Sequence, residues 1–313
     1  MAPSGVDEGR VPRIVRAYDA SRRWFEVSLT LARGVFVGAW LGLLDRTALH
    51  ATDELYYRRT RMYHDDQYNL SGFFPWEMQA FERHFQSCHS VLVTAAGGGR
   101  EVVALERRGL AVAAFECHPG LAQRANELLQ REGLTARVTL APRDECPSGI
   151  PTCDGAIIGW TSYTLMQHAS TRMRFLKQVR AHLRDGAPLL VSVFARREAL
   201  RYLRIVTATA NVLRALRGLQ KAELGDDLGP NFVHHFTEDE LAAELEAGGF
   251  RLAEFSRVGS PHAIAYAVGA VDDPSVQGSV SDEEEAESSC GQVATEQPRD
   301  APTGFDLRDT PHL

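Results

Sequence analysis

A short glycine-rich segment constrains the fold of this chain more than any other sequence feature. The apolar run VLVTAA starts at Val91 and leads into glycines at positions 97–99, and a helical pattern begins at about Arg100. Glycines let a backbone approach a ligand without a Cβ clash, and the start of the following helix supplies free N–H donors. The next apolar run, AVAAFE, ends in Glu116, where a carboxylate is suited to accept ribose hydroxyl groups. This order of strand, glycines, helix and acid predicts a nucleotide-binding turn.

The spacing of the glycines narrows the class of ligand. A dinucleotide turn of the form GxGxxG, counted from Gly97 and Gly99, requires a third glycine where Val102 stands. A phosphate loop requires the sequence GK followed by Ser or Thr, and the segment GGGREV does not provide it. We therefore disfavour both a pyrophosphate site and a phosphate-loop NTPase.

The surrounding pattern predicts an α/β protein. From about Pro75 to Val268, short apolar strand-like runs alternate with helical ones, which is typical of βαβ units around a parallel sheet. We expect a doubly wound, Rossmann-like sheet of seven mostly parallel strands with helices on both faces. The expected strands cover residues 90–95, 112–116, 137–140, 155–159, 188–194, 251–256 and 263–268. The expected helices cover residues 76–85, 100–108, 120–132, 171–183 and 238–247.

Charge and hydropathy divide the chain into three segments. We predict an N-terminal helical extension at residues 1–68 and the domain that contains the sheet at residues 69–269. Residues 270–313 are predicted to form a disordered acidic tail. The formal net charge of the 313 residues is -7, and the tail holds 11 acidic residues against two basic ones. Residues 1–269 are therefore close to neutral. The tail has too few apolar residues to offset the entropy of ordering it.

Residues 195–231 interrupt the α/β pattern with a basic helical insertion. Apolar residues recur there at helical spacing, which predicts an amphipathic helix. Two interpretations stay open, namely a lid or surface for an anionic substrate and an ordinary solvated helix face. The basic residues of the insertion are Arg196, Arg197, Arg201, Arg204, Arg214, Arg217 and Lys221.

The longest apolar run covers residues 28–44. It is interrupted by Arg33 and is shorter than the roughly 20 residues that a membrane-spanning helix needs. Gly34, Gly38 and Gly42 recur every four residues and predict a face that another helix approaches closely. We expect a helix packed in the core or at a partner interface, and we do not favour membrane association.

The cysteines and the N-terminal residues indicate a compartment. The five cysteines form no CxxC pair, which fits a reducing environment, and the first residues lack the apolar core of a signal peptide. We therefore expect a cytoplasmic protein. The sequence predicts no oligomeric state.

The glycine turn resembles that of the class I S-adenosylmethionine-dependent methyltransferases. Ala95, Gly97 and Gly99 occupy the three small positions of the family's GxGxG turn, with Ala95 in place of the first glycine. Val93 stands where many members carry an acid. The resemblance covers about 190 residues, from Pro75 onward. It implies S-adenosyl-L-methionine as the cofactor and a methyltransferase activity.

The resemblance also implies roles for residues beyond the turn. Glu116 corresponds to the acid that holds the cofactor ribose, and Cys117 follows it on the adenine side. Asp144 stands where members commonly keep an acid near the adenine amino group. Trp160 lies in the strand tip GWTSY, which borders the methyl donor and the acceptor. Near the C-terminal end of the domain, Thr237 and Glu240 fit a capping box, a structural role.

The implied reaction is an in-line methyl transfer to a small-molecule or lipid-like acceptor. Its leaving group is neutral, so the protein mainly orients the reactants, and no catalytic signature is required. Where the acceptor must lose a proton, Tyr68, His64 and His235 are weak candidates for the base. We expect no metal, because His64 and the neighbouring aspartates lack a third ligand at a recognisable spacing. The near-neutral domain without a known binding motif makes nucleic acid an improbable partner.

Two other functions stay open. A protein of the same fold without catalytic activity would act as a binding or scaffold module. An aminopropyltransferase shares the fold and a GGG turn, and it would need acids in a polyamine pocket, for which Asp65 and Asp66 are the available pair. Binding of S-adenosylmethionine distinguishes these classes.

Overall fold

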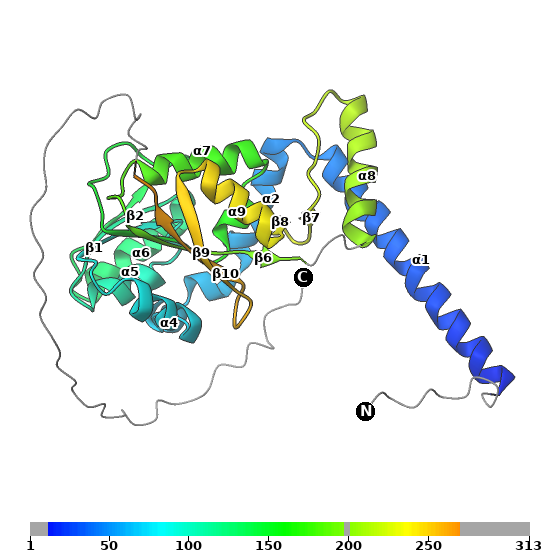
Figure 1. Ribbon diagram of the computed structural model, residues 1–313, viewed down its shortest axis with the longest axis horizontal. Helices are drawn as coiled ribbons and strands as arrows, with labels where there is room; N and C mark the ends of the chain where they lie inside the picture. Colours follow the sequence, from blue (N-terminus) through cyan, green and yellow to red (C-terminus); the bar gives the residue numbers. More distant parts are fainter. Residues whose placement is uncertain (1–11, 197–200, 270–313) are drawn as a thin grey trace, which may run out of the picture. The chain divides into compact units, whose positions relative to one another are not determined.

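The computed structural model describes residues 12–196 and 201–269. The predicted acidic tail, residues 270–313, lies outside the described residues. Figure 1 shows a central sheet with helices packed around it. The sheet has seven strands in the order β3-β2-β1-β4-β5-β10-β9. Its strands are β1 Ser90–Thr94, β2 Ala111–Glu116, β3 Val138–Leu140, β4 Gly155–Ile158, β5 Pro188–Ser192, β9 Phe250–Ser256 and β10 His262–Ala267.

The predicted sheet is confirmed. Strands β1 to β5 pair in parallel, whereas β10 runs antiparallel to both β5 and β9. In β1, Leu92 faces one apolar layer, and Val91 and Val93 face the other, because successive side chains of a strand point to opposite faces. A strand covered on both faces reads as a continuous apolar run, as VLVTAA does.

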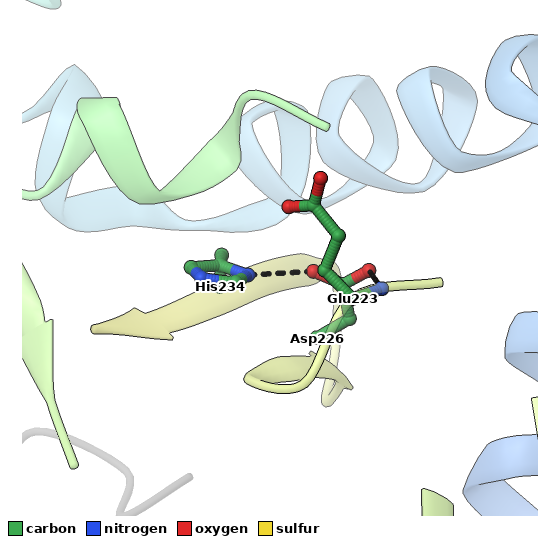
Figure 2. Close-up of side chains that lie close together, drawn as sticks. All are labelled: Glu223, Asp226 and His234. Atoms are coloured by element: carbon green, nitrogen blue, oxygen red, sulfur yellow. Dashed lines mark hydrogen bonds and ion pairs between the residues drawn. The ribbon is translucent and has the colours of Figure 1, made fainter. Parts of the chain in front are cut away.

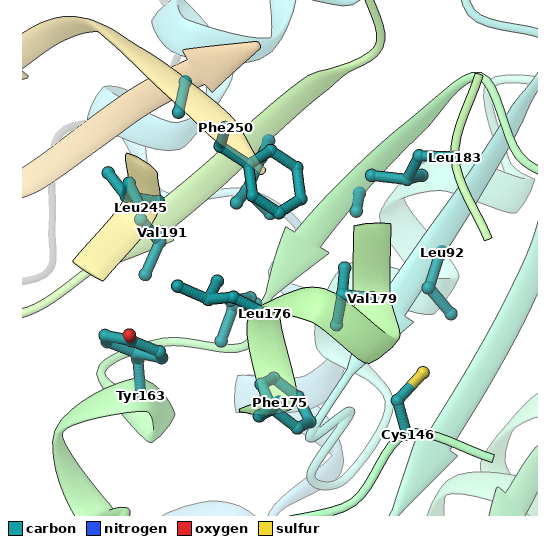
Figure 3. Close-up of a cluster of buried hydrophobic side chains, with 14 of the residues drawn as sticks. Leu92, Cys146, Tyr163, Phe175, Leu176, Val179, Leu183, Val191, Leu245 and Phe250 are labelled. Carbon is teal, nitrogen blue, oxygen red and sulfur yellow. The ribbon is translucent and has the colours of Figure 1, made fainter. Parts of the chain in front are cut away.

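Helices cover both faces of the sheet, as expected for a doubly wound fold. One layer contains residues of α7 and α9, and Figure 3 shows part of it, including Leu176 and Val179 of α7 and Leu245 of α9. The other layer contains residues of α4, α5 and α6, such as Phe81 and Leu105. The bounds are α4 Pro75–His84, α5 Arg100–Glu106, α6 Pro119–Arg131, α7 Ala169–Arg180 and α9 Glu238–Ala247.

The capping box at the start of α9 is confirmed. The backbone N–H of Glu240 donates to Thr237 Oγ1 at 3.2 Å, and the Thr237 N–H donates to Glu240 Oε2 at 2.9 Å. Two otherwise unpaired donors at the helix N-terminus are thereby satisfied.

The insertion between the fifth and sixth strands of the large sheet differs from the expectation of a basic helix alone. Its helix, α8 Arg201–Leu216, is followed by a second, three-stranded sheet with the order β6-β8-β7. The predicted strand 188–194 ends at Ser192, and β6, Phe194–Ala195, belongs to this second sheet. Its other strands are β7 Asp226–Leu228 and β8 Phe232–Phe236. The strand β8 was missed because its buried histidine interrupts the apolar pattern that marks a strand.

The N-terminal segment is helical, with α1 Arg13–Leu43, α2 Arg46–Arg59, the 3-10 turn η2 Arg61–His64 and α3 Asp66–Leu70. Figure 1 shows α1 and α8 side by side. The glycine face of α1 makes this contact: a Cβ at Gly38 would lie 2.5 Å from the carbonyl oxygen of Val206. The Arg214 side chain of α8 also donates to the Leu41 carbonyl at 2.7 Å. The predicted helix contact of the glycine face therefore exists within this chain.

Substitution of Gly38 tests this helix contact. Because there is no room for a side chain between the two backbones, we expect Gly38→Leu to lower the free energy of unfolding by about 1–3 kcal/mol. Ala32→Leu introduces the same side chain at an exposed position of α1 and should leave stability nearly unchanged. Urea denaturation of both variants measures the difference. Equal stability of the two would contradict the close approach of α1 and α8.

Candidate functional site

A cavity of about 460 Å³ opens at the carboxyl ends of the central strands. The strand order reverses between β1 and β4, and ligands of open α/β sheets bind at such a switch point. The loops after β1, β2, β3 and β4 all contribute lining residues, and so do α2 and the segment around α3. The cavity therefore lies between the sheet and the N-terminal helices.

The glycine turn forms one wall of the cavity. Ala95, Gly97 and Gly99 all have positive φ, at 51°, 54° and 98°. Gly98 is required for a different reason, because a Cβ there would lie 2.5 Å from the Asn69 side chain and 2.6 Å from the Tyr63 carbonyl oxygen. The N-terminal segment thus packs directly on the turn. By contrast, a Cβ at Gly97 would have no atom within 4 Å, so the space beside that residue is open.

Glu116 connects the tips of β1 and β2. Its Oε2 accepts a hydrogen bond from the Gly97 N–H at 2.8 Å, and its Oε1 accepts from the N–H groups of Cys117 and His118, each at 2.8 Å. The residue is buried and lines the cavity. Each carboxylate oxygen has two lone pairs, so Oε2 retains acceptor capacity for a ligand hydroxyl.

Asp144 is held at the other end of the cavity by α2. Its Oδ2 accepts from Arg46 Nη2 at 2.9 Å and lies 3.4 Å from His50 Nε2. Burial by itself would raise the pKa of Asp144, but the contacts from His50 and Arg46 and the charge of Arg143 outweigh it and lower the pKa below its usual value. Asp144 is therefore a fixed anion next to the cavity.

A second acid beside the loop that follows β3 is Asp53 of α2, which pairs with Arg143 of that loop. The Asp53 side chain is buried, and this burial raises its pKa to about 6 even though the Arg143 charge opposes the shift. The two ion pairs, Asp53 with Arg143 and Asp144 with Arg46, fasten α2 across the loop after β3.

Aromatic side chains form the wall on the side of the N-terminal segment. The rings of Tyr57 and Tyr63 lie 5.0 Å apart, and those of Tyr63 and Tyr68 lie 6.0 Å apart. The series of rings continues through Phe74, which lies 6.3 Å from Tyr68, to Trp160 after β4, which contacts Phe74 edge to face at 5.2 Å. Burial raises the pKa of Tyr68 well above its usual value, so the hydroxyl keeps its proton at neutral pH. Tyr68 is therefore suited to donate a hydrogen bond and unsuited to act as a base.

Arg100, the first residue of α5, follows the glycine turn directly and contacts the aromatic residues. Its buried guanidinium donates to Glu77 at 2.5 and 2.7 Å and to Glu101 at 2.7 Å. It also lies 3.9 Å from the centre of the Phe74 ring and donates to the Gly72 carbonyl at 2.8 Å. These contacts hold the residues before α4 against the start of α5.

Most of the residues that sequence analysis selected for the cofactor site border one cavity. Gly99 does not line it, because it packs against Ala125 of α6. The cavity residues among those selected are Ala95, Gly97, Glu116, Cys117, Asp144, Trp160 and the candidate base Tyr68. Burial and the nearby Glu116 charge raise the pKa of Cys117 to about 12, so its thiol is protonated at neutral pH.

The two candidate histidines lie away from this cavity. His64 Nε2 is 2.9 Å from the Tyr57 carbonyl oxygen, and the ring does not border the cavity. His235 lies in β8, where its Nε2 is 3.8 Å from Asp227, and it does not line the cavity either. Neither histidine is placed to accept a proton from a molecule in the cavity.

The contribution of α2 to the cavity was not predicted from the sequence. Thr47, His50, Ala51 and Glu54 line the cavity from one face of this helix. Their spacing of three or four residues is the one signal available in the sequence, because positions so spaced share a helix face. That signal does not say which face meets the sheet domain.

A cluster of Glu223, Asp226 and His234 lies outside the cavity, and Figure 2 shows the His234 ring beside Asp226. Asp226 Oδ1 accepts from His234 Nδ1 at 2.7 Å, and Oδ2 accepts from the Glu223 N–H at 2.7 Å. The two Glu223 oxygens accept from the Ala169 N–H and from Arg172, each at 2.9 Å. All four carboxylate oxygens therefore have protein donors, and we assign the cluster a structural role.

The raised pKa of Asp53 predicts how stability depends on pH. The folded state binds a proton at Asp53 more tightly than the unfolded chain does. The protonated carboxyl therefore contributes fully to stability below the unfolded pKa of 3.8, and this contribution is lost as the pH rises through about 6. The loss amounts to about 3 kcal/mol, so Asp53→Asn should flatten the fall in stability between pH 4 and 6. Denaturant unfolding at several pH values measures this slope. Glu82→Gln, which removes an exposed carboxylate, should keep the wild-type slope, and an unchanged slope in Asp53→Asn would contradict the assignment.

Comparison with known proteins identifies the fold. No family model and no curated protein matches the sequence. Among solved structures, a SAM-dependent methyltransferase of Methanosarcina mazei matches with a TM-score of 0.51 and 19% identity, over 63% of this chain and 99% of that one. The 1,6-didemethyltoxoflavin-N1-methyltransferase of Burkholderia thailandensis, with bound 1,6-didemethyltoxoflavin and S-adenosylhomocysteine, also matches. Its TM-score is 0.51 and its identity 20%, and the match covers 72% of this chain and 92% of that one. The chain has the fold of the class I S-adenosylmethionine-dependent methyltransferases.

Proposed function

We propose that the cavity binds S-adenosyl-L-methionine and that the protein transfers its methyl group to a small-molecule or lipid-like acceptor. One observation carries the proposal: the open side of the glycine turn and the buried carboxylate of Glu116 border the same cavity at the switch point of the sheet. The cavity volume of about 460 Å³ lies in the range of small-molecule sites. The toxoflavin methyltransferase has the same fold and binds the small molecule 1,6-didemethyltoxoflavin, which supports a small-molecule acceptor for this protein.

The residues present fit this cofactor. Glu116 would accept hydrogen bonds from the ribose hydroxyl groups, and the turn at Gly97 would lie against the amino-acid portion. Asp144, an anion at the opposite end, would accept from the adenine amino group, with Cys117 beside it. A sulfonium cofactor supplies an activated methyl group and leaves as a neutral thioether.

The protein's part in the transfer is to orient the reactants and exclude water. The aromatic wall of Tyr57, Tyr63 and Tyr68 closes the cavity on the side of the N-terminal segment. Tyr68 would donate a hydrogen bond to the acceptor and so fix its position. Holding two reactants in near-attack geometry removes much of the entropic barrier without any proton transfer by the protein.

The contacts of Asp65 and Asp66 disfavour an aminopropyltransferase. Asp66 pairs with Arg124 and Arg131 at 2.8 and 2.7 Å, and Asp65 caps α3 by accepting from the Gln67 N–H at 3.1 Å. Neither carboxylate borders the cavity. A scaffold without activity stays an alternative, and the test below separates it from the enzyme.

Calorimetric titration with S-adenosylmethionine, S-adenosylhomocysteine, NAD and ATP tests the proposal. We expect binding of the first two ligands only. Binding of none of the four would favour the scaffold, and tight binding of NAD or ATP would reject the assignment of the cavity.

Variants of Glu116 test how the cofactor is held. Loss of a charge-assisted contact to the ribose should weaken S-adenosylhomocysteine binding in Glu116→Ala by about 2 kcal/mol, or roughly 30-fold. Glu116→Gln retains the side-chain shape and one oxygen, so its affinity should lie between those of Glu116→Ala and the wild type. Glu127→Ala, which removes an exposed glutamate of α6, serves as the control and should bind like the wild type. Wild-type affinity in Glu116→Ala would show that the ribose lies elsewhere.

A further inference from the structure

Helix α1 has a second apolar face that no described residue covers. Its glycine face packs on α8, and on a helical projection the opposite side carries a series of large apolar residues spaced by three, four or seven positions. We call this series the outer stripe. It consists of Tyr18, Phe25, Leu29, Phe36, Trp40 and Leu43, with exposed fractions of 46–66%.

The helix also extends beyond its partner. The described start of α8, Arg201, lies near Arg33 of α1, whose guanidinium is 5.2 Å from the centre of the Tyr202 ring. N-terminal to this point, Trp24, Val27 and Leu31 continue on the side of the glycine face, and all three are exposed. This half of α1 is therefore apolar on two sides without a described covering element. Soluble proteins rarely leave so large a contiguous apolar surface unless it serves an interaction.

The charges next to these apolar residues are mainly positive. From Arg13 to Leu43 the helix has five arginines and two acids, and both acids are paired with Arg22 or Arg23. Arg13 and Arg16 form no ion pair with any described residue. An amphipathic helix with arginines beside Trp, Phe and Leu is typical of elements that bind the surface of an anionic membrane.

We propose that α1 binds the surface of an anionic phospholipid membrane. The outer stripe would enter the boundary between headgroups and acyl chains, and the arginines of α1 would contact phosphate groups. Trp40 and Tyr18 suit that depth because their rings are partly polar. The inference is independent of the proposed methyl transfer.

The structure favours a helix that lies on the membrane over one that crosses it. By length and hydropathy, α1 is the one helix in the described part of the chain that meets the requirements for a membrane span. However, its glycine face is held against α8, whose buried Arg214 donates to the carbonyl groups of Leu41 and Leu44. A crossing helix would carry this arginine and the attached sheet domain into the hydrocarbon, at high cost.

Charge also favours lipid over a second copy of the chain as the occupant. Helix α1 carries five arginines and two acids, so two outer stripes packed together would bring two helices of positive net charge into contact, and like charges at an interface oppose association. Anionic headgroups supply the complementary charge.

Vesicle flotation of the full-length chain tests the proposal. We expect binding to vesicles of phosphatidylcholine with phosphatidylglycerol, weaker binding to phosphatidylcholine alone, and a decrease as salt rises. The double variant Phe25→Glu with Phe36→Glu should bind the anionic vesicles at least about tenfold more weakly, because two apolar side chains are replaced by charges that the membrane repels. Val258→Glu places one such charge at an apolar residue that is 77% exposed in the turn between β9 and β10, and it should bind like the wild type.

Further measurements separate the alternatives. Circular dichroism melting should show that the double variant folds, because both replaced residues are exposed. Absence of wild-type binding to either vesicle, or undiminished binding of the double variant, would overturn the proposal. Light scattering that shows a dimer, lost in the double variant, without vesicle binding would assign the stripe to a second copy. Resistance of bound protein to extraction with alkaline carbonate would contradict the surface orientation.

Discussion

The carboxylate of Glu116 is the interaction on which the candidate site depends. By accepting hydrogen bonds from N–H groups of the turn after β1 and of the loop after β2, it connects the tips of two neighbouring strands. A buried carboxylate without these donors would be costly, and the donors would be unpaired without the carboxylate. The same group borders the cavity. The Glu116 side chain therefore both connects the two strand tips and places a negative charge at the border of the cavity.

The N-terminal segment completes this site. Asn69 and Tyr63 pack against Gly98, and two ion pairs from α2 reach the loop that follows β3. Arg100 holds the residues before α4 in place from the other side. Residues before the sheet thus form the aromatic wall and one complete side of the cavity. Changes in α2 are expected to alter what the cavity accepts, because its lining residues lie on one helix face.

Helix α1 has two faces that carry side chains of different size, because one face packs closely on α8 and the other does not. Glycines at four-residue intervals allow the backbone of α8 to approach within contact distance, which large side chains would prevent. The opposite face carries the large aromatic and aliphatic residues, and no described element covers them. The sequence signal at Gly34, Gly38 and Gly42 was interpreted correctly as a helix contact. It did not reveal the outer stripe, because an apolar run does not tell which of its side chains a neighbour will bury.

The sequence by itself determined the large sheet, its strand pattern and the glycine turn. Continuous apolar runs, glycines and an acid at a strand tip are local signals that residues such as Val91, Gly97 and Glu116 carry in their order. Only the tertiary structure decided that α2 lines the cavity, that His64 and His235 lie outside it, and that β6, β7 and β8 form a second sheet. These features depend on contacts between residues 50 or more positions apart, such as Asp53 with Arg143, or on strands paired across an inserted helix. Local periodicity does not encode which distant surface a helix face meets, because that choice is made by the packing of the whole domain.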